Sequence, residues 1–298
     1  MYDSLERILQ EMEKKRQEFW QVIQENDCRE RRITKETSYM QMEEMRKAME
    51  QADRSYDGTL MSESGLVGGE GAKLMAARRA GTVLCGDFIG LVMEKALKMG
   101  EFNACMRRIV AAPTAGSCGV VPAVLLSMQE IMKLRKEQIV QALYVAAGIG
   151  GVIANRACIA GAAGGCQAEI GTSSAMAAGA AVYLRGGSGR QIADSAGLAL
   201  KNLMGLVCDP VAGLVEIPCV KRNSMGAVNA LVCADEVLAG IKSKIPPDQV
   251  IDAMRAVGES MAENLKETGD GGIAATPRGI EISKRLGTFA GKTLKSKA

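Results

Sequence analysis

The chain has 298 residues, of which 47% are hydrophobic, so it is long and apolar enough to bury a sizeable core. Its 37 basic and 34 acidic residues are interleaved and leave a net charge of only +3, which argues against nucleic acid as a partner. Aromatic residues make up only 3%, whereas Gly, Met and Ala are abundant, and this favours close-packed helices over sheets. The sequence therefore predicts an all-α fold, a compact multi-helix domain rich in Ala and Gly helices with an N-terminal helical arm.

The N-terminal sequence MYDSLERILQEMEKKRQ is charged throughout and lacks the apolar run of a signal peptide, which favours a cytoplasmic location. In that reducing compartment the nine cysteines are not expected to form a disulfide framework. Apolar stretches such as VVPAVLLSMQEIM are interrupted by charge or proline before they reach the roughly 18 residues of a membrane span. We therefore expect no association with a membrane.

Charge and apolar spacing divide the chain into a charged helical arm, residues 1–53, and a main domain, residues 54–298. The main domain begins with SYDGTLMSESGLVGGEG (55–71), which is predicted to be a loop because it is rich in Gly and Ser. In GTSSAMAAGAAVYL (171–184), the many small residues indicate a helix that is buried on nearly every side. The helices predicted for the main domain are 71–99, 101–111, 120–133, 136–160, 168–185, 189–207, 220–242 and 247–266.

Three cysteines lie in breaks between the predicted helices. Cys166 follows two glycines and precedes a helix, where the positive end of the helix dipole favours a thiolate. Cys208 and Cys219 bracket a loop fixed by Pro210 and Pro218, so both sulfur atoms can turn toward one point. The alternative for each is a small buried apolar residue, the commonest fate of a free cysteine. Five others lie in the arm or within helical patterns and are assigned to that alternative: Cys28, Cys85, Cys105, Cys158 and Cys233.

Three thiolates in a chain without histidine argue against a catalytic zinc site, and their spacing lacks the paired hooks of a zinc ribbon. Soft thiolates suit an iron–sulfur cluster instead. A four-iron cluster held by three cysteines leaves one iron open, and an open iron is a Lewis acid rather than only an electron carrier. The three cysteines therefore indicate the centre of a hydro-lyase.

Five strings in chain order closely resemble the α subunit of iron–sulfur-dependent L-serine dehydratase. They are SESGLVGG (62–69), AAPTAGSCGVVPAVL (111–125), GGCQAEIGTSSAMAAG (164–179), LKNLMGLVCDPVAGLVEIPCVKRNSMGAVNA (200–230) and GGIAATPRG (271–279). The resemblance implies a helical catalytic domain that converts L-serine to pyruvate and ammonia with a [4Fe–4S] cluster and without pyridoxal phosphate. It also implies Cys166, Cys208 and Cys219 as the cluster ligands, and a separate β subunit as partner.

Two loops in these strings resemble the substrate-binding loops of that family. Ser62, Ser64 and Gly65 belong to the first loop, and Thr114 and Gly116 belong to the second. Hydroxyls and loop amides are suited to binding the carboxylate of a small amino acid. The alternative for these residues is ordinary loop and cap chemistry.

Polar residues also follow Cys219 at a predicted helix start. Arg222 is expected to clamp a carboxylate, and Asn223 to hydrogen-bond it or a cluster sulfide. The alternative for Lys221 and Arg222 is a pair of solvated surface cations. We interpret Glu169 as an acid that the helix dipole favours in a first turn. The resembling family often has an acidic residue where this chain has Ala163, so any role of that carboxylate must be supplied differently here.

The residue that removes the Cα proton of serine stays open. Without histidine it is a lysine, a carboxylate, an ionised hydroxyl or a group of the β subunit. Two other functions remain as alternatives: an iron–sulfur lyase for L-cysteine or another β-substituted amino acid, and a non-catalytic helical subunit that binds a cluster. A pyridoxal-phosphate dehydratase would need an α/β core, and the sequence has few strand patterns.

Overall fold

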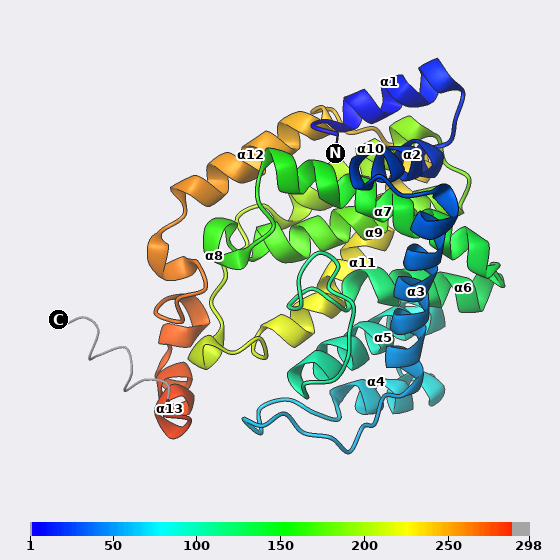
Figure 1. The fold of residues 1–298 in the computed structure, drawn as a ribbon. Helices are drawn as coiled ribbons and strands as arrows, with labels where there is room; N and C mark the ends of the chain where they lie inside the picture. The colour runs from blue at the N-terminus through cyan, green and yellow to red at the C-terminus, as the bar shows by residue number, and fades with distance from the viewer. Residues whose placement is uncertain (1, 288–298) are drawn as a thin grey trace.

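A computed structural model describes residues 2–287, which form thirteen α-helices and no strand (Figure 1), so the predicted all-α fold is confirmed. A single bridge pairs Cys208 with Lys266. The helices are α1 (Leu5–Lys15), α2 (Phe19–Arg31), α3 (Lys35–Arg54), α4 (Glu70–Arg79), α5 (Gly86–Ala104), α6 (Val120–Met132), α7 (Lys136–Arg156), α8 (Gly161–Gly164), α9 (Thr172–Leu184), α10 (Gly189–Leu203), α11 (Cys219–Leu238), α12 (Pro247–Ser260) and α13 (Pro277–Arg285).

Helix α9 lies at the centre of the molecule, where it packs against α6, α7, α10 and α11 (Figure 1). Every residue of α9 except Tyr183 is buried, as its small residues predicted. At Gly179 a Cβ would overlap Ile149 of α7, so the two helix axes approach more closely than any larger residue would permit. The helix with the fewest bulky side chains is therefore the one around which the others pack.

Helix α7 corrects the expectation that apolar stretches are too short to cross a membrane. Among residues 2–287 it alone is long and apolar enough to do so by length and composition. However, 72% of its apolar window is buried inside the structure, where α7 packs against α2, α3 and α9. Burial of this extent is typical of the core helix of a folded domain.

The N-terminal residues form α1, α2 and α3, and their apolar faces join the same buried cluster as the rest of the chain. Phe19 and Val22 of α2 are buried in the contact with α7, and α1 packs against α10. Ser4 and Thr34 cap α1 and α3 by accepting hydrogen bonds from backbone N–H groups. The boundary at residue 53 between an arm and a main domain stays a prediction.

The helices predicted at 71–99 and 101–111 were wrong. The chain instead turns at Gly81, which has a φ of 69° and ends α4, and then continues through Gly100 within α5. A Cβ on Gly100 would lie 3.1 Å from Val220 Cγ1, so this glycine lets α5 pack closely against α11 rather than ending a helix. The remaining predicted helices are present with shorter ends, and the one at 168–185 begins with a π-helical turn.

Candidate functional site

Cys166 lies at the entry to α9, directly before a π-helical turn. Single π-helical turns within α-helices occur frequently at functional sites. The preceding Gly165 has a φ of 75°, and a Cβ there would lie 2.9 Å from the carbonyl oxygen of Leu206. The N–H of Gln167 donates to the same carbonyl at 2.9 Å. Cys166 is thereby held against the segment that follows α10.

Cys208 follows α10 in an extended stretch that pairs with the C-terminal part of the chain. Its N–H donates to the carbonyl of Leu265 at 2.8 Å, and its carbonyl accepts from the N–H of Glu267 at 2.7 Å. The side chain of Asp209 accepts from the N–H of Ile273 at 2.9 Å. The segment of residues 261–276 therefore holds Cys208 in place.

Cys219 is the first residue of α11, and Asn223 lies one turn further along the helix. The side-chain amide of Asn223 donates to the carbonyls of Cys219 at 3.0 Å and Gly116 at 2.8 Å. Its oxygen accepts from the N–H of Gly119 at 2.8 Å, and the residue is 1% exposed. Asn223 thus joins α11 to the loop that carries Thr114. Its predicted contact with substrate or sulfide stays a prediction.

The three predicted cluster ligands lie close enough for their charges to interact. Cys166, Cys208 and Cys219 are 2%, 3% and 8% exposed. Burial raises the pKa of Cys166 to about 11 and that of Cys219 to about 12, and it also raises the pKa of Cys208. The charge of Cys166 further raises the pKa of the other two thiols. At Cys166, burial therefore opposes the thiolate, whereas the nearby Arg222 favours it. The thiolate expected there stays a prediction.

Arg222 and Lys221 are adjacent in sequence but lie in different environments. The Arg222 guanidinium lies close enough to Cys166 for their charges to interact, and it forms an ion pair with Asp209 at 2.9 Å. Its side chain is only 15% exposed. Lys221 is 63% exposed and pairs with Glu70 at 2.7 Å. Arg222 therefore belongs to the site, whereas Lys221 is the solvated cation that the sequence allowed.

The first predicted substrate loop contacts the loop between the second and third cysteines. Ser62 and Ser64 donate to Oε2 of Glu216 at 3.0 Å and 2.5 Å, and Gly65 turns the loop with a φ of 72°. Sequence reasoning missed Glu216. A signal was present, because Glu216 is the single charged residue among the seven between Pro210 and Pro218.

The second predicted loop lies beside Glu169, which the sequence favoured as a first-turn acid rather than as a partner of the site residues. The Thr114 side chain lies near the Glu169 carboxyl, and a Cβ on Gly116 would lie 3.5 Å from Glu169 Oε1. A Cβ on Gly161 would lie 2.8 Å from Cys208 Sγ and 2.9 Å from Glu169 Oε2. Burial raises the pKa of this carboxyl. Its position three residues after Cys166, on the same side of a helical turn, was the available signal.

The arrangement of the three thiols suits a cluster and a single metal ion to different degrees. Within residues 2–287, no three His, Cys, Asp or Glu side chains are placed to share a single metal ion. In a cubane each cysteine binds a different iron, so the three sulfur atoms need not converge on one point. The thiols are mutually close, buried and accompanied by a cation, and the absence of a side chain at Gly161 lets the backbone approach Cys208 closely. The residues present therefore fit a cluster better than a single ion.

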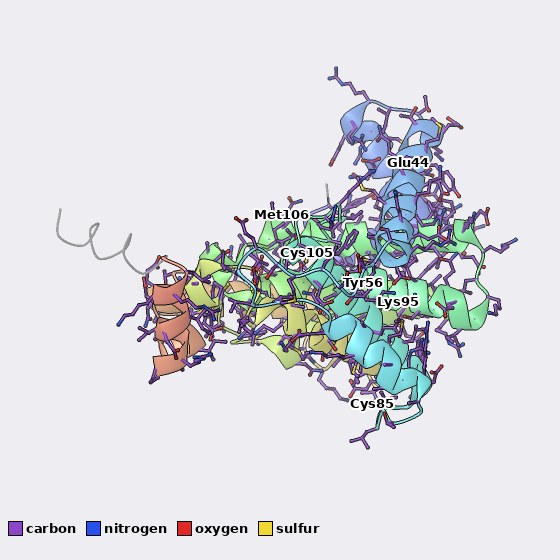
Figure 2. The ribbon with its side chains drawn as sticks, turned by 90° about the horizontal axis from the view of Figure 1, so that it is seen from below. Glu44, Tyr56, Cys85, Lys95, Cys105 and Met106 are labelled. Atoms are coloured by element: carbon purple, nitrogen blue, oxygen red, sulfur yellow. The ribbon has the colours of Figure 1, made fainter. Side chains whose placement is uncertain are left out.

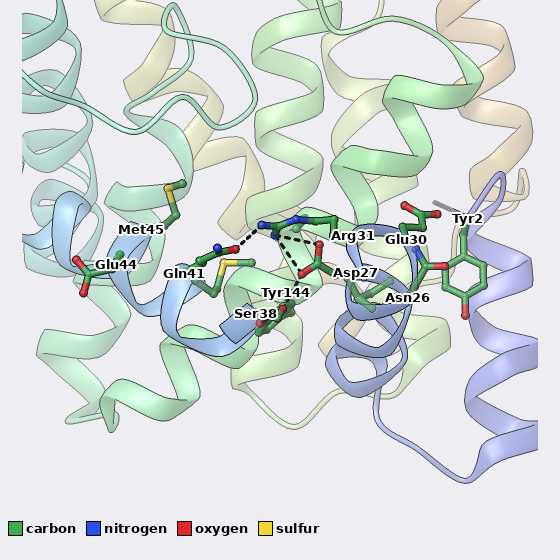
Figure 3. Close-up of a pocket in the computed structure, with 14 residues that line it drawn as sticks. Tyr2, Asn26, Asp27, Glu30, Arg31, Ser38, Gln41, Glu44, Met45 and Tyr144 are labelled. Carbon is green, nitrogen blue, oxygen red and sulfur yellow. Dashed lines mark hydrogen bonds and ion pairs between the residues drawn. The ribbon is translucent and has the colours of Figure 1, made fainter. Parts of the chain in front are cut away.

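A cavity of about 470 Å³ lies elsewhere, between α2, α3 and α7 (Figure 3). Inside it the Ser38 hydroxyl lies 2.6 Å from Asp27 and 2.7 Å from the Tyr144 hydroxyl, so these polar groups satisfy one another. None of the predicted site residues lines this cavity. The remaining cysteines are also dispersed: Cys85 and Cys105 lie at opposite ends of α5 (Figure 2).

The sequence placed four cysteines within helices of the main domain. Of these four, Cys233 alone is inside a helix. Cys85 and Cys105 flank α5, and Cys158 follows α7, so their expected positions within helices were wrong. All nine cysteines are free, and Cys118, which the sequence did not single out, is buried at the start of α6. Cys105, Cys118, Cys158 and Cys233 lack the charge interactions that join the three predicted ligands.

The chain is similar in sequence to known proteins. Residues 11–274 match the family described as serine dehydratase alpha chain. The chain is 49% identical over 265 residues to the probable L-serine dehydratase, alpha chain, of Bacillus subtilis (strain 168), covering 89% of this chain and 88% of that protein. It is 43% identical over 224 residues to the L-serine dehydratase, alpha chain, of Peptoniphilus asaccharolyticus, covering 75% and 77%.

The L-serine dehydratase TdcG of Escherichia coli (strain K12) is 40% identical over 181 residues, which cover 60% of this chain and 40% of that protein. The extent of the family match and these identities leave no ambiguity about descent. The chain belongs to the serine dehydratase alpha chain family. The resemblance inferred from the five strings is confirmed.

Proposed function

We propose that this chain is the α subunit of an L-serine ammonia-lyase that holds a [4Fe–4S] cluster on Cys166, Cys208 and Cys219. The observation that carries the proposal is the assembly of these cysteines, from three segments of chain, into one buried group whose charges interact. The relatives named L-serine dehydratase, alpha chain, support serine as the substrate.

Bound through three thiolates, such a cluster supplies Lewis-acid chemistry at the iron that lacks a protein ligand, which suits the loss of a poor leaving group such as a hydroxyl. The chain supplies the setting. The three thiols must lose their protons to become ligands, and the cationic Arg222 beside Cys166 favours the charged sulfur. Asp209 in turn fixes the guanidinium at 2.9 Å.

The reaction removes the Cα proton and the β-hydroxyl of serine as water and leaves aminoacrylate. Aminoacrylate tautomerises to an imine, and water then hydrolyses the imine to pyruvate and ammonia. The loops of Ser62, Ser64 and Gly65 and of Thr114 and Gly116 are proposed to bind and orient the substrate. Of the bases allowed by the sequence, a carboxylate has a candidate in Glu169, which faces Cys208. A group of the β subunit remains the alternative.

A separate β subunit is the proposed protein partner, supported by the alpha-chain names of the relatives. We also propose a cytoplasmic location, because nine free cysteines and an oxygen-sensitive cofactor suit a reducing compartment. Residues 54–298 would form the catalytic domain, with residues 1–53 as the helical arm.

Quantification of iron and sulfide in anaerobically purified protein, with and without the β subunit, tests the cofactor. We expect about four of each per chain and a broad brown absorbance. Pyruvate release is then compared for L-serine, L-threonine and L-cysteine. Fastest turnover of L-cysteine would favour the related lyase, and a loaded cluster without any turnover would favour a non-catalytic subunit. An aldimine absorbance band without iron would contradict the proposal.

A further inference from the structure

Glu216 is a buried carboxylate without a counter-charge. It lies in the loop between Cys208 and Cys219 and is 8% exposed. Oε2 accepts the hydroxyls of Ser62 and Ser64, and within residues 2–287 no lysine or arginine forms an ion pair with Glu216. Among the described residues the N–H of Val220 in α11 donates to the backbone carbonyl of Glu216, and no backbone N–H of α11 donates to its carboxylate. Burial of a charge without a partner is costly, so the site favours a cation at this point.

Three other buried acids in this chain have such compensation. Glu94 pairs with Arg78 at 2.9 Å, and Asp209 pairs with Arg222 at 2.9 Å. Glu101 accepts two backbone N–H groups at the start of α4, where the helix dipole is positive. Glu216 has only two neutral hydroxyls. Because both bind Oε2, Oε1 is left without a hydrogen-bond partner among the described residues, and it is not sealed from solvent.

Glu216 is positioned to face a ligand held by the other site residues. Its neighbour Val215 lies beside Gly116, since a Cβ on Gly116 would be 3.3 Å from Val215 Cγ1 and 3.5 Å from Glu169 Oε1. The two proposed substrate loops therefore meet at Glu216 and Val215. An amino-acid substrate brings one ammonium group to this place, and the amides of the two loops are suited to its carboxylate.

We propose that Glu216 binds the α-ammonium group of the amino-acid substrate through Oε1. Ser62 and Ser64 orient the Glu216 carboxylate through their bonds to Oε2. This inference rests on the proposed ammonia-lyase function. It changes the role of the two serines, which act on the substrate through Glu216 rather than by direct contact. It also makes the site selective for amino acids over hydroxy acids of the same shape.

The variant Glu216→Gln removes the charge and keeps an oxygen for the two serine hydroxyls. In the cluster-loaded enzyme with its β subunit, we expect the KM for L-serine to rise about 10- to 100-fold, as for loss of one charge-assisted contact. The inhibition constant of 3-hydroxypropanoate, which has the carboxylate and β-hydroxyl of serine but no ammonium, should change less than about threefold. Iron content should stay at the wild-type level. Glu63→Gln is the matched control, because Glu63 lies between the same two serines but is exposed.

A parallel loss of affinity for serine and 3-hydroxypropanoate would show that Glu216 only holds the loops together and would overturn the inference. An unchanged KM would overturn it as well. If the variant does not fold, the wild-type enzyme still decides: 3-hydroxypropanoate must bind at least about tenfold more weakly than serine. Calorimetric titration with L-alanine and propanoate, which cannot undergo elimination, separates this inference from the reaction. Preferred binding of L-alanine that is lost in Glu216→Gln, without pyruvate formation, would refute the proposed reaction but retain the ammonium site.

Discussion

The region around α9 and the loops that carry the cysteines are built by different forces. Helices α7, α9 and α10 meet through small apolar side chains, and α9 has almost no surface outside the core. The loops 55–69, 105–119, 204–218 and 261–276 meet mainly through hydrogen bonds made by buried polar groups. Asn223 and Asp209 are such groups, and they are 1% and 3% exposed. The core is therefore specified by shape, whereas the site is specified by a few directional contacts.

This contrast has a consequence for mutation. Apolar packing is distributed over many atoms, so a small change in the core is expected to reduce stability while leaving the site geometry intact. A hydrogen bond depends on two particular groups, so removal of one partner leaves the other buried and unsatisfied. Changes at the site loops should therefore affect iron binding and activity more than they affect global unfolding.

Substitution of any of Cys166, Cys208 or Cys219 by serine has the largest expected effect on function. A serine hydroxyl is a poor ligand for iron, so each variant should lose its brown absorbance, most of its iron and more than about 99% of its activity. Iron assay and pyruvate release after anaerobic reconstitution measure this. Urea unfolding is compared between cluster-free forms of the variants and the wild type, where burial of one unpaired hydroxyl should cost about 1–3 kcal/mol.

Cys233→Ser and Cys105→Ser are the matched controls for those variants. Cys233 is fully buried in α11, and Cys105 ends α5, yet neither interacts electrostatically with the three predicted ligands. Both should retain wild-type iron. Equal iron loss at all five positions would mean that the ligands have been assigned wrongly.

Asn223→Ala tests the directional contacts of the site. The variant leaves the N–H of Gly119 and the carbonyls of Gly116 and Cys219 without their partner. We expect a loss of about 2–4 kcal/mol in the free energy of unfolding, together with a loss of iron. Urea unfolding and iron assay measure the two effects. Wild-type iron content in this variant would contradict the view that Asn223 fixes the loop around Cys219.

Gly179→Ala tests the packing of the core. The added methyl group would overlap Ile149, so α7 and α9 must separate or Ile149 must change its rotamer. We expect a loss of about 1–3 kcal/mol in the free energy of unfolding. Iron content and KM of the folded protein should remain near those of the wild type. If Gly179→Ala loses as much iron as Asn223→Ala, a change in core packing also disturbs the site, and the contrast between the two regions is wrong.

The same contrast explains what could be predicted from the sequence of the core. Composition and the run of small residues at 171–184 correctly indicated helices and a central helix, because both depend on local spacing. The two failures in helix boundaries both involve glycine: Gly81 ends α4, whereas Gly100 lies within α5 against Val220. Ending a helix and permitting close packing require the same residue. Only the neighbour across the contact distinguishes the two roles.

At the site, sequence patterns identified residues but not their partners. Strings around the cysteines and the Ser and Thr loops pointed to the segments that the structure brings together. Glu216 was missed, and Glu169 was interpreted as a first-turn acid. The position of each depends on contacts between distant segments, such as the bond between Ser62 and Glu216, which are 154 positions apart. Such pairing is a property of the tertiary fold and leaves little trace in local spacing.

The smallest expected effect is that of pH on a partly solvated group of ion pairs in the N-terminal helices. Glu25 of α2 accepts a hydrogen bond from Gln17 at 2.6 Å and pairs with Lys15 and Lys35, and these contacts lower the pKa of its carboxyl to about 2. A carboxyl with a lowered pKa in the folded state contributes stability above its unfolded pKa, and this contribution is lost as the pH falls from about 4.5 to 2.

Glu25→Gln should therefore lower the free energy of unfolding at pH 7 by less than about 1 kcal/mol, because the ion pairs are partly solvated. The difference between the variant and the wild type should shrink as the pH is lowered through this window, and urea midpoints at several pH values measure it. Glu13→Gln, which removes an exposed carboxylate without an ion pair among the described residues, is the control. Iron content and KM should be unchanged at pH 7. A loss of iron in Glu25→Gln would mean that the N-terminal helices are mechanically coupled to the cysteine loops, and that the arm contributes to the site as well as to the core.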